Sequence, residues 1–166
     1  MTVYSPAVNT YVPIASITLT SSASEILLTG FDTKYNDIVL VATSKSTSSL
    51  YDQGINFNGD DNDANYKSIA MWGNGTSRGR ANLTWHLDYY GSVDTTNTTA
   101  TIVQIMDLNS SDKHTTFFSR SNRVASGVDA IAGRWANTAV VTSIRYFLIG
   151  GTLDAGSSLV AYGIEA

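Results

Sequence analysis

Short segments in which apolar and polar residues alternate recur along the chain and predict β-strands. The clearest of them spans 83–90, where the odd positions from Leu83 onward are apolar or aromatic and the even positions are mostly polar. A period of two places the two sets of side chains on opposite faces of a strand. A second segment of this kind runs through Ile17 and Leu19. Pro13 near its start is typical of an edge strand, because proline cannot donate a ladder hydrogen bond.

The segment 38–43 differs from these, because nearly every position in it is apolar. A continuous apolar run of this length predicts a strand covered on both faces, in the middle of a sheet. Further strands are expected at 25–29, 66–72, 100–108, 114–120 and 124–135, and the glycines of the last predict a bulge or bend. The spacing of three and four residues that marks a long helix is missing.

Two clusters of turn-forming residues separate these strands. Asn58, Gly59 and Asp60 follow the alternating residues around Phe57 and are a strong turn signal. Residues 73–79 contain three glycines among Asn, Thr, Ser and Arg, and they predict an exposed, flexible loop.

The last thirty-odd residues predict a hairpin that closes the fold. Its first arm, 138–149, is rich in β-branched and aromatic residues, and its second arm, 158–164, is short and apolar. Gly150, Gly151 and Gly156 between the arms suit a reversal of the chain. We expect the second arm to be buried in the core sheet.

Ten or eleven short strands separated by regular turn signals predict an all-β fold of two packed sheets. We expect a jelly roll or a closely related antiparallel β-sandwich with extra edge strands, and an immunoglobulin-like sandwich is the second choice. Residues 1–10 are polar and are expected to form an N-terminal arm, and 11–166 a single domain. A chain of this length buries enough surface for a core of its own.

Composition narrows the functional classes. The 166 residues include no Cys, so disulfide bonds and thiolate metal sites are excluded. The formal net charge is −4, and the ten Lys and Arg residues are scattered, which argues against nucleic acid as a partner. The sequence lacks an apolar run of membrane-spanning length and a charged leader, so we expect a soluble protein that neither binds a membrane nor is secreted.

Residues that carry out catalysis are scarce in this sequence. His86 and His114 lie in predicted strands without a serine or carboxylate motif beside them, and phosphate loops and hydrolase motifs are missing. We therefore expect a non-enzymatic protein without a cofactor. The one dense carboxylate cluster, Asp60, Asp61 and Asp63, is a candidate Ca²⁺ site. The alternative, which we favour, is a turn whose side chains cap backbone groups.

Aromatic side chains are the other candidate for binding chemistry. The three tryptophans and nine tyrosines include residues that a sugar-binding platform would use, with Tyr51, Tyr66, Tyr89 and Tyr90 as the candidates for exposed rings. Most of the rings, Trp72, Trp85 and Trp135 among them, are expected in the core or at a subunit interface.

Three stretches of the sequence share a pattern with a known group of proteins. They read Phe57-Asn-Gly-Asp60 followed by Ala64-Asn-Tyr66, the strand-like segment from Trp135 to Ile144, and Asp154-Ala-Gly-Ser-Ser-Leu-Val-Ala-Tyr-Gly-Ile164. Together they resemble small virion proteins of tailed bacteriophages, notably cyanophages and other aquatic phages. The sequence departs from that pattern at 61–63, in place of a Thr/Gly-rich turn, and at Ala161, where Leu is usual.

The resemblance implies a structural role in a virion. The expected function is that of a homo-oligomeric capsid cement or decoration protein on the outside of the shell, bound to the major capsid protein. The alternative is a tail- or fibre-associated module that binds a host glycan. The residues expected to contact a partner are Tyr4 and Pro6 in the arm, and Arg78 and Arg80, which suit an acidic patch of the shell.

Overall fold

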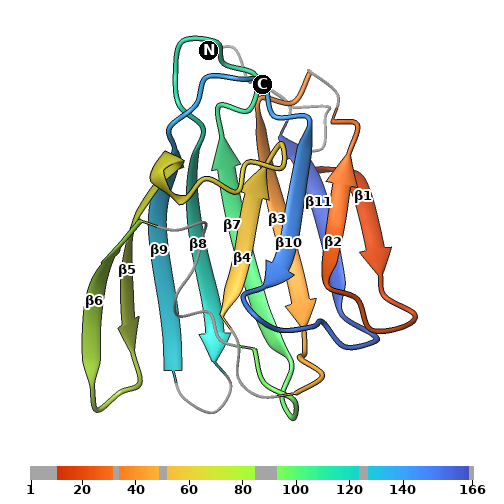
Figure 1. Cartoon of the computed structure of the whole chain (residues 1–166), viewed down its shortest axis with the longest axis vertical. Helices are drawn as coiled ribbons and strands as arrows, with labels where there is room; N and C mark the ends of the chain where they lie inside the picture. The colour runs from red at the N-terminus through yellow and green to blue at the C-terminus, as the bar shows by residue number, and fades with distance from the viewer. Residues whose placement is uncertain (1–10, 32–33, 49–51, 85–92, 124–126, 165–166) are drawn as a thin grey trace, which may run out of the picture.

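The computed structural model describes residues 11–31, 34–48, 52–84, 93–123 and 127–164 (Figure 1). These residues form eleven strands and one short 3₁₀-helix, η1, as the sequence led us to expect of an all-β chain. The N-terminal arm predicted at 1–10 lies outside the described residues. The elements are β1 (Tyr11–Thr18), β2 (Glu25–Thr29), β3 (Asp37–Ser44), β4 (Gln53–Phe57), η1 (Asp63–Asn65), β5 (Tyr66–Gly73), β6 (Arg78–Leu83), β7 (Thr99–Met106), β8 (Thr116–Arg123), β9 (Gly127–Trp135), β10 (Ser143–Leu148) and β11 (Ser158–Ile164).

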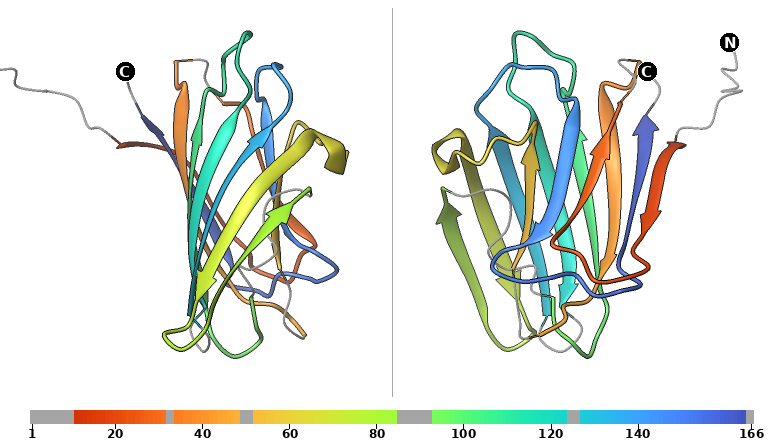
Figure 2. Two further views of the ribbon diagram at one scale, coloured as in Figure 1. Left: turned by 90° about the vertical axis from the view of Figure 1, so that its left-hand side faces the viewer. Right: turned by 45° about the vertical axis from the view of Figure 1, so that its right-hand side comes forward.

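The strands form two antiparallel sheets that pack as a sandwich, which confirms the predicted fold class. The larger sheet has the order β1-β11-β3-β7-β8-β9-β5-β6 and the smaller one β2-β10-β4. Figure 1 shows the smaller sheet in front of the larger one, and the side view in Figure 2 shows the two layers. Strands from the two ends of the chain pair in nested order, β1 with β11 and β2 with β10, as in a jelly roll.

The core lies between the two sheets and is built from the inward positions of each strand. Leu40, Phe57, Ile144 and Leu159 come from four strands of the two sheets, and each is fully buried. β3 lies between β11 and β7, so the apolar segment at 38–43 forms an interior strand of the sheet, as predicted. Pro13 also lies where the sequence placed it, in the edge strand β1 and next to a register shift.

The predicted closing hairpin is wrong, because its two arms belong to different sheets. β10 pairs with β2 and β4, whereas β11 pairs with β1 and β3. The connection 149–157 crosses between the layers and is fixed by the buried Leu153, which forms bridges to Ala23 and Ser46. Burial of the second arm in the core sheet is confirmed, since Leu159 and Ala161 are both fully buried.

Three smaller expectations also change. The loop predicted at 73–79 is shorter, because β5 continues to Gly73 and β6 begins at Arg78. The strand predicted at 83–90 overlaps β6 only at Leu83, and 85–92 lie outside the described residues. β9 pairs in continuous register on both sides and has no bulge. Its Gly133 serves packing instead, because a Cβ there would lie 2.3 Å from the ring of Phe117.

The turn after β4 is built by the residues of the Phe57–Asp60 motif. The Asp60 N–H donates to the carbonyl of Phe57 at 2.9 Å, and both central residues have positive φ, 54° at Asn58 and 68° at Gly59. Asn-Gly is the preferred pair for such a type I′ geometry. The Asn58 side chain also accepts from the N–H groups of Thr142 and Ser143 at 2.7 and 3.1 Å, so this turn holds the entry of β10.

The Asp60 carboxylate joins this turn to the larger sheet. One oxygen accepts from the Asn62 N–H at 3.0 Å, and the other accepts from the Asn65 amide at 2.8 Å and from the indole N–H of Trp135 at 2.6 Å. Trp135 ends β9 and is buried against Phe57, with ring centroids 5.6 Å apart. One carboxylate thereby fixes η1 and the crossover between the sheets.

Tyr66 completes the same crossover from the first position of β5. Its hydroxyl donates to the Asp60 carbonyl at 3.0 Å and accepts from the Phe57 N–H at 3.1 Å. Burial, together with the nearby charges of Asp60 and Asp61, raises the pKa of the Tyr66 phenol well above its ordinary value, against the opposing effect of the hydrogen bond from the Phe57 N–H. The hydroxyl therefore stays a neutral donor at physiological pH. These contacts give the Phe57–Tyr66 motif a structural role.

We expect Asp60→Asn to lower the free energy of unfolding by roughly 1–3 kcal/mol, because an amide cannot accept from all three donors. Urea denaturation would measure this. The matched control is Asp112→Asn on an exposed turn, where the carboxylate bonds to the Ser110 hydroxyl, and its midpoint should stay close to that of the parent. Equal midpoints for the two variants would contradict the role given to Asp60.

Candidate interaction surface

The outward face of β5 to β9 is the surface of this molecule with the most distinctive chemistry. This face is on the side of the larger sheet away from the core, because the alternate residues of these strands, such as Ala70 and Ile131, are buried. Cross-strand pairs place its residues in rows. The central row runs Ile102, Arg120, Ala130, Met71 and Arg80 across β7, β8, β9, β5 and β6.

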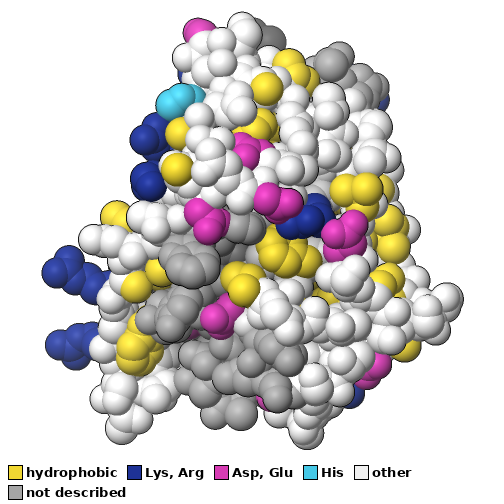
Figure 3. Space-filling view, viewed as in Figure 1, with side chains coloured by type: hydrophobic (Ala, Val, Ile, Leu, Met, Phe, Trp, Pro, Cys, Tyr) yellow, Lys and Arg dark blue, Asp and Glu magenta, His cyan; other side chains and the backbone are white. Residues whose placement is uncertain are grey.

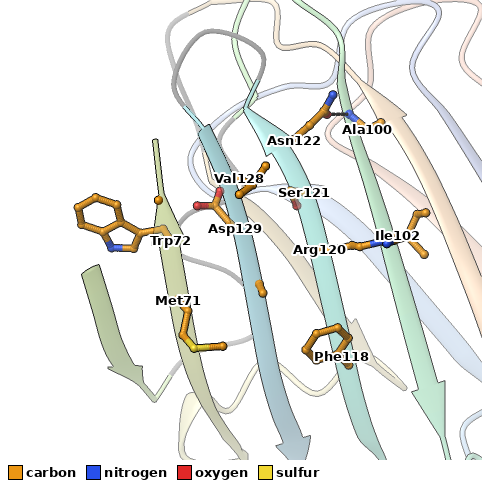
Figure 4. A pocket seen from close by; sticks show the side chains of 12 residues that line it. Met71, Trp72, Ala100, Ile102, Phe118, Arg120, Ser121, Asn122, Val128 and Asp129 are labelled. Atoms are coloured by element: carbon orange, nitrogen blue, oxygen red, sulfur yellow. Dashed lines mark hydrogen bonds between the residues drawn. The ribbon is translucent and has the colours of Figure 1, made fainter. Parts of the chain in front are cut away.

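A shallow groove lies across β9 on this face, between β5 and β7, and we call it the β9 groove. Its floor is low at Ala130 of β9, because the cross-strand neighbours of this residue are the larger Arg120 on β8 and Met71 on β5. The open volume is about 730 Å³. Figure 4 shows side chains of β5, β9, β8 and β7 around it.

The walls of the β9 groove are mainly apolar and solvent-exposed. Met71, Val128 and Phe118 are 57%, 63% and 40% exposed, although they are large apolar side chains. A smaller hollow of about 180 Å³ lies between Ile102 and Phe118. Single exposed apolar residues are common on protein surfaces, but a contiguous group at a depression marks a binding surface.

Positive charge is the second property of this face. Five of the ten basic residues of the chain project from it, and none of the outward residues of these five strands is acidic. None of these cations forms an ion pair with a carboxylate of the described residues, and Arg134 instead bonds to His114 at 2.7 Å. They are Lys67, Arg78, Arg80, Arg120 and Arg134.

The opposite side of the sandwich, over the smaller sheet, has a different charge pattern. There Arg145 pairs with Asp61 at 2.5 Å and with Glu25 at 3.7 Å, and its guanidinium lies 4.5 Å from the centre of the Phe147 ring. Figure 3 shows a basic group between acidic groups at the centre of this side. The cation of β10 is therefore balanced by two carboxylates, whereas those of the outer face have no carboxylate partner in the part of the chain that the structure describes.

Folding stability does not account for the charges of the outer face. Lys67 and Arg134 are direct cross-strand partners, and like charges in that position destabilise a sheet. A destabilising pair of like charges beside exposed apolar residues is typical of a functional surface. The outer face is therefore the candidate interaction surface.

Of the residues predicted to contact a partner, Arg78 and Arg80 both lie on this face, in β6. Tyr4 and Pro6 lie outside the described residues. Sequence reasoning missed Arg120 and the apolar walls, because alternation shows that two faces exist without showing which face is covered. The register between β8, β9 and β5 was needed to bring them together.

The carboxylate cluster at 60–63 follows the capping pattern. Asn62 caps η1 by accepting from the Ala64 N–H at 3.1 Å, Asp60 holds Trp135 and Asn65, and Asp61 accepts from the Asn56 amide at 2.6 Å. Within the described ranges, no group of three or more His, Asp or Glu side chains is placed to hold a metal ion.

The aromatic candidates are mostly internal where they are described. Tyr66 is fully buried, so its expected exposure is wrong, and Trp135 is core, as predicted. Tyr51, Trp85, His86, Tyr89 and Tyr90 lie outside the described residues. In the part of the chain that the structure describes, no helix is long and apolar enough to cross a membrane.

No protein-family model matches this chain, and no curated protein does. Among solved structures it is similar to an exo-inulinase from Aspergillus awamori, at 12% identity and a TM-score of 0.49, over 92% of this chain and 29% of the inulinase. It is also similar to an alginate lyase variant in complex with alginate tetrasaccharide, at 11% identity and a TM-score of 0.29, over 90% of this chain and 80% of the lyase. Neither likeness is close enough to assign an activity or a substrate.

The adjacent residues Phe117 and Phe118 provide a test of the two faces of the sheet. Phe117 is 2% exposed and Phe118 is 40% exposed. We expect Phe117→Ala to lower the free energy of unfolding by about 3–5 kcal/mol. Phe118→Ala should change it by less than about 1 kcal/mol. Urea denaturation of both variants measures the difference, and equal losses would mean that the outer face is covered within the monomer.

Proposed function

We propose that this chain is a non-enzymatic structural protein of a bacteriophage virion, where it acts as a capsid cement or decoration protein on the outside of the shell. The observation that carries the binding role is the outer face of β5 to β9, with exposed apolar walls and five cations that form no ion pair with a carboxylate of the described residues. The assignment to a virion is supported by the resemblance of the Phe57–Tyr66 and 154–164 segments to phage virion proteins.

The chemistry of the outer face fits a protein partner. Protein interfaces are enriched in Met, Phe and Arg, and the β9 groove is lined in part by Met71, Phe118 and Arg120. The proposed partner is the major capsid protein, with an acidic patch that faces Arg78 and Arg80. The edge strands β1 and β6 leave ladder groups for a further copy of the chain, which suits the proposed homo-oligomer.

The alternative, a tail or fibre module that binds a host glycan, has weaker support. Sugar-binding sites use exposed Trp or Tyr rings beside several polar groups. Two aromatic residues line the β9 groove, Phe118 and Trp72, and the Trp72 ring packs against Gly79 of β6. Most of the remaining lining is apolar. This chemistry favours a protein over a carbohydrate.

Copy number separates the two proposals. In purified particles of the phage that encodes this chain, a cement protein should be present in hundreds of copies, and a fibre module in few. Quantitative gel densitometry against the major capsid band measures the ratio. We expect at least about one copy per several capsid subunits, and a ratio far below that would contradict the cement role.

A further inference from the structure

We infer that the β9 groove binds an extended acidic segment of a partner protein, in which Asp or Glu residues alternate with apolar ones. This inference rests on the proposed binding role of the outer face and names the chemistry of the occupant. It needs neither a particular phage nor a particular position on the shell.

The shape of the β9 groove suits a single extended chain. Its lining passes from Met71 on β5 over Ala130 on β9 to Ile102 on β7, so an extended occupant lies across the strands. Arg120 and Arg80 occupy the same cross-strand row on β8 and β6, with β9 and β5 between them. At about 4.8 Å between neighbouring strands, their backbones are roughly 14 Å apart.

The walls of the groove explain why the occupant is expected to alternate. Side chains of an extended segment point in opposite directions at successive positions. One set can enter the groove between Phe118 and Met71, where apolar groups are favoured by burial. The other set remains near the rims, where Arg80 and Arg120 can form paired hydrogen bonds with carboxylates.

Charge favours an acidic protein segment over a nucleic acid. The cations of the outer face lack carboxylate partners among the described residues, so an acidic occupant supplies the missing charge. A polynucleotide would place a phosphate at every residue along walls that are apolar at Met71, Val128 and Phe118.

Fluorescence anisotropy with defined probes tests the inference. The main probe is a labelled peptide of about ten residues in which Glu alternates with Leu, long enough to cross the sheet from β7 to β6. The comparison probes are a peptide with Lys in place of Glu, one with Ser in place of Leu, and a single-stranded DNA oligonucleotide of equal charge. We expect the Glu/Leu peptide to bind most tightly and to weaken as salt increases.

Two kinds of variant separate charge from shape. Arg78→Glu with Arg80→Glu should weaken binding of the Glu/Leu peptide by about tenfold or more, since the gain from several exposed ion pairs is reversed. Lys34→Glu with Lys113→Glu makes the same change in net charge away from the outer face and should have little effect. Ala130→Trp fills the floor and should also weaken binding, without any change in charge. Circular dichroism of each variant verifies the fold.

The opposite results are also specific. If the two charge-reversed variants lose peptide affinity equally, the effect comes from net charge alone, and the proposed site is overturned. Unchanged affinity in Ala130→Trp would exclude the groove. Tighter binding of the DNA probe would assign the face to polyanions and overturn the inference in favour of nucleic acid.

The inference and the proposed function can fail separately. If the chain binds the Glu/Leu peptide but is absent or rare in virions, the acidic-segment site is retained and the cement role is rejected. If the chain is abundant in virions and the Arg78→Glu, Arg80→Glu variant is incorporated at the parental level, the cement role is retained and this site is rejected.

Discussion

The hydrogen bond between the Asp60 carboxylate and the Trp135 indole, 2.6 Å long, is the contact on which the arrangement of the two sheets depends. A β-sandwich needs chain crossings between its layers, and each crossing leaves backbone groups without a ladder partner. Here the turn at Asn58 holds the start of β10, and Asp60 holds η1 and the end of β9. The same residues form the motif that resembles phage virion proteins. The motif therefore has a role in the fold and does not identify the binding partner.

The fixed sandwich allows its two outer surfaces to differ in chemistry. The pairing of β8, β9 and β5 aligns large, small and large outward side chains into the β9 groove. The same pairing places Lys67 beside Arg134, at a cost to stability that the crossover and core offset. Over the smaller sheet, Arg145 is instead matched by Asp61 and Glu25. This difference in charge balance supports the proposed binding role of the larger sheet.

Sequence pattern predicted the local structure better than the long-range pairing. Alternation and turn residues located most strands and the two-layer class, and the apolar segment at 38–43 was placed correctly as an interior strand. The pairing of β10 and β11 was not predictable, because each arm alternates in a way that suits either sheet. For the candidate surface, Arg78 and Arg80 stood out as neighbours in sequence. Arg120 joins them only through the register of three intervening pairs.

The most direct test of the account is hydroxyl-radical footprinting of the chain, free and bound to the capsid shell, with oxidation measured by mass spectrometry. Met71 and Phe118 on the outer face and Leu27 on the smaller sheet are exposed to similar degrees in the free chain, at 57%, 40% and 49%. The account predicts that binding protects Met71 and Phe118 and leaves Leu27 as reactive as before. Protection of Leu27, with Met71 and Phe118 unchanged, would contradict it.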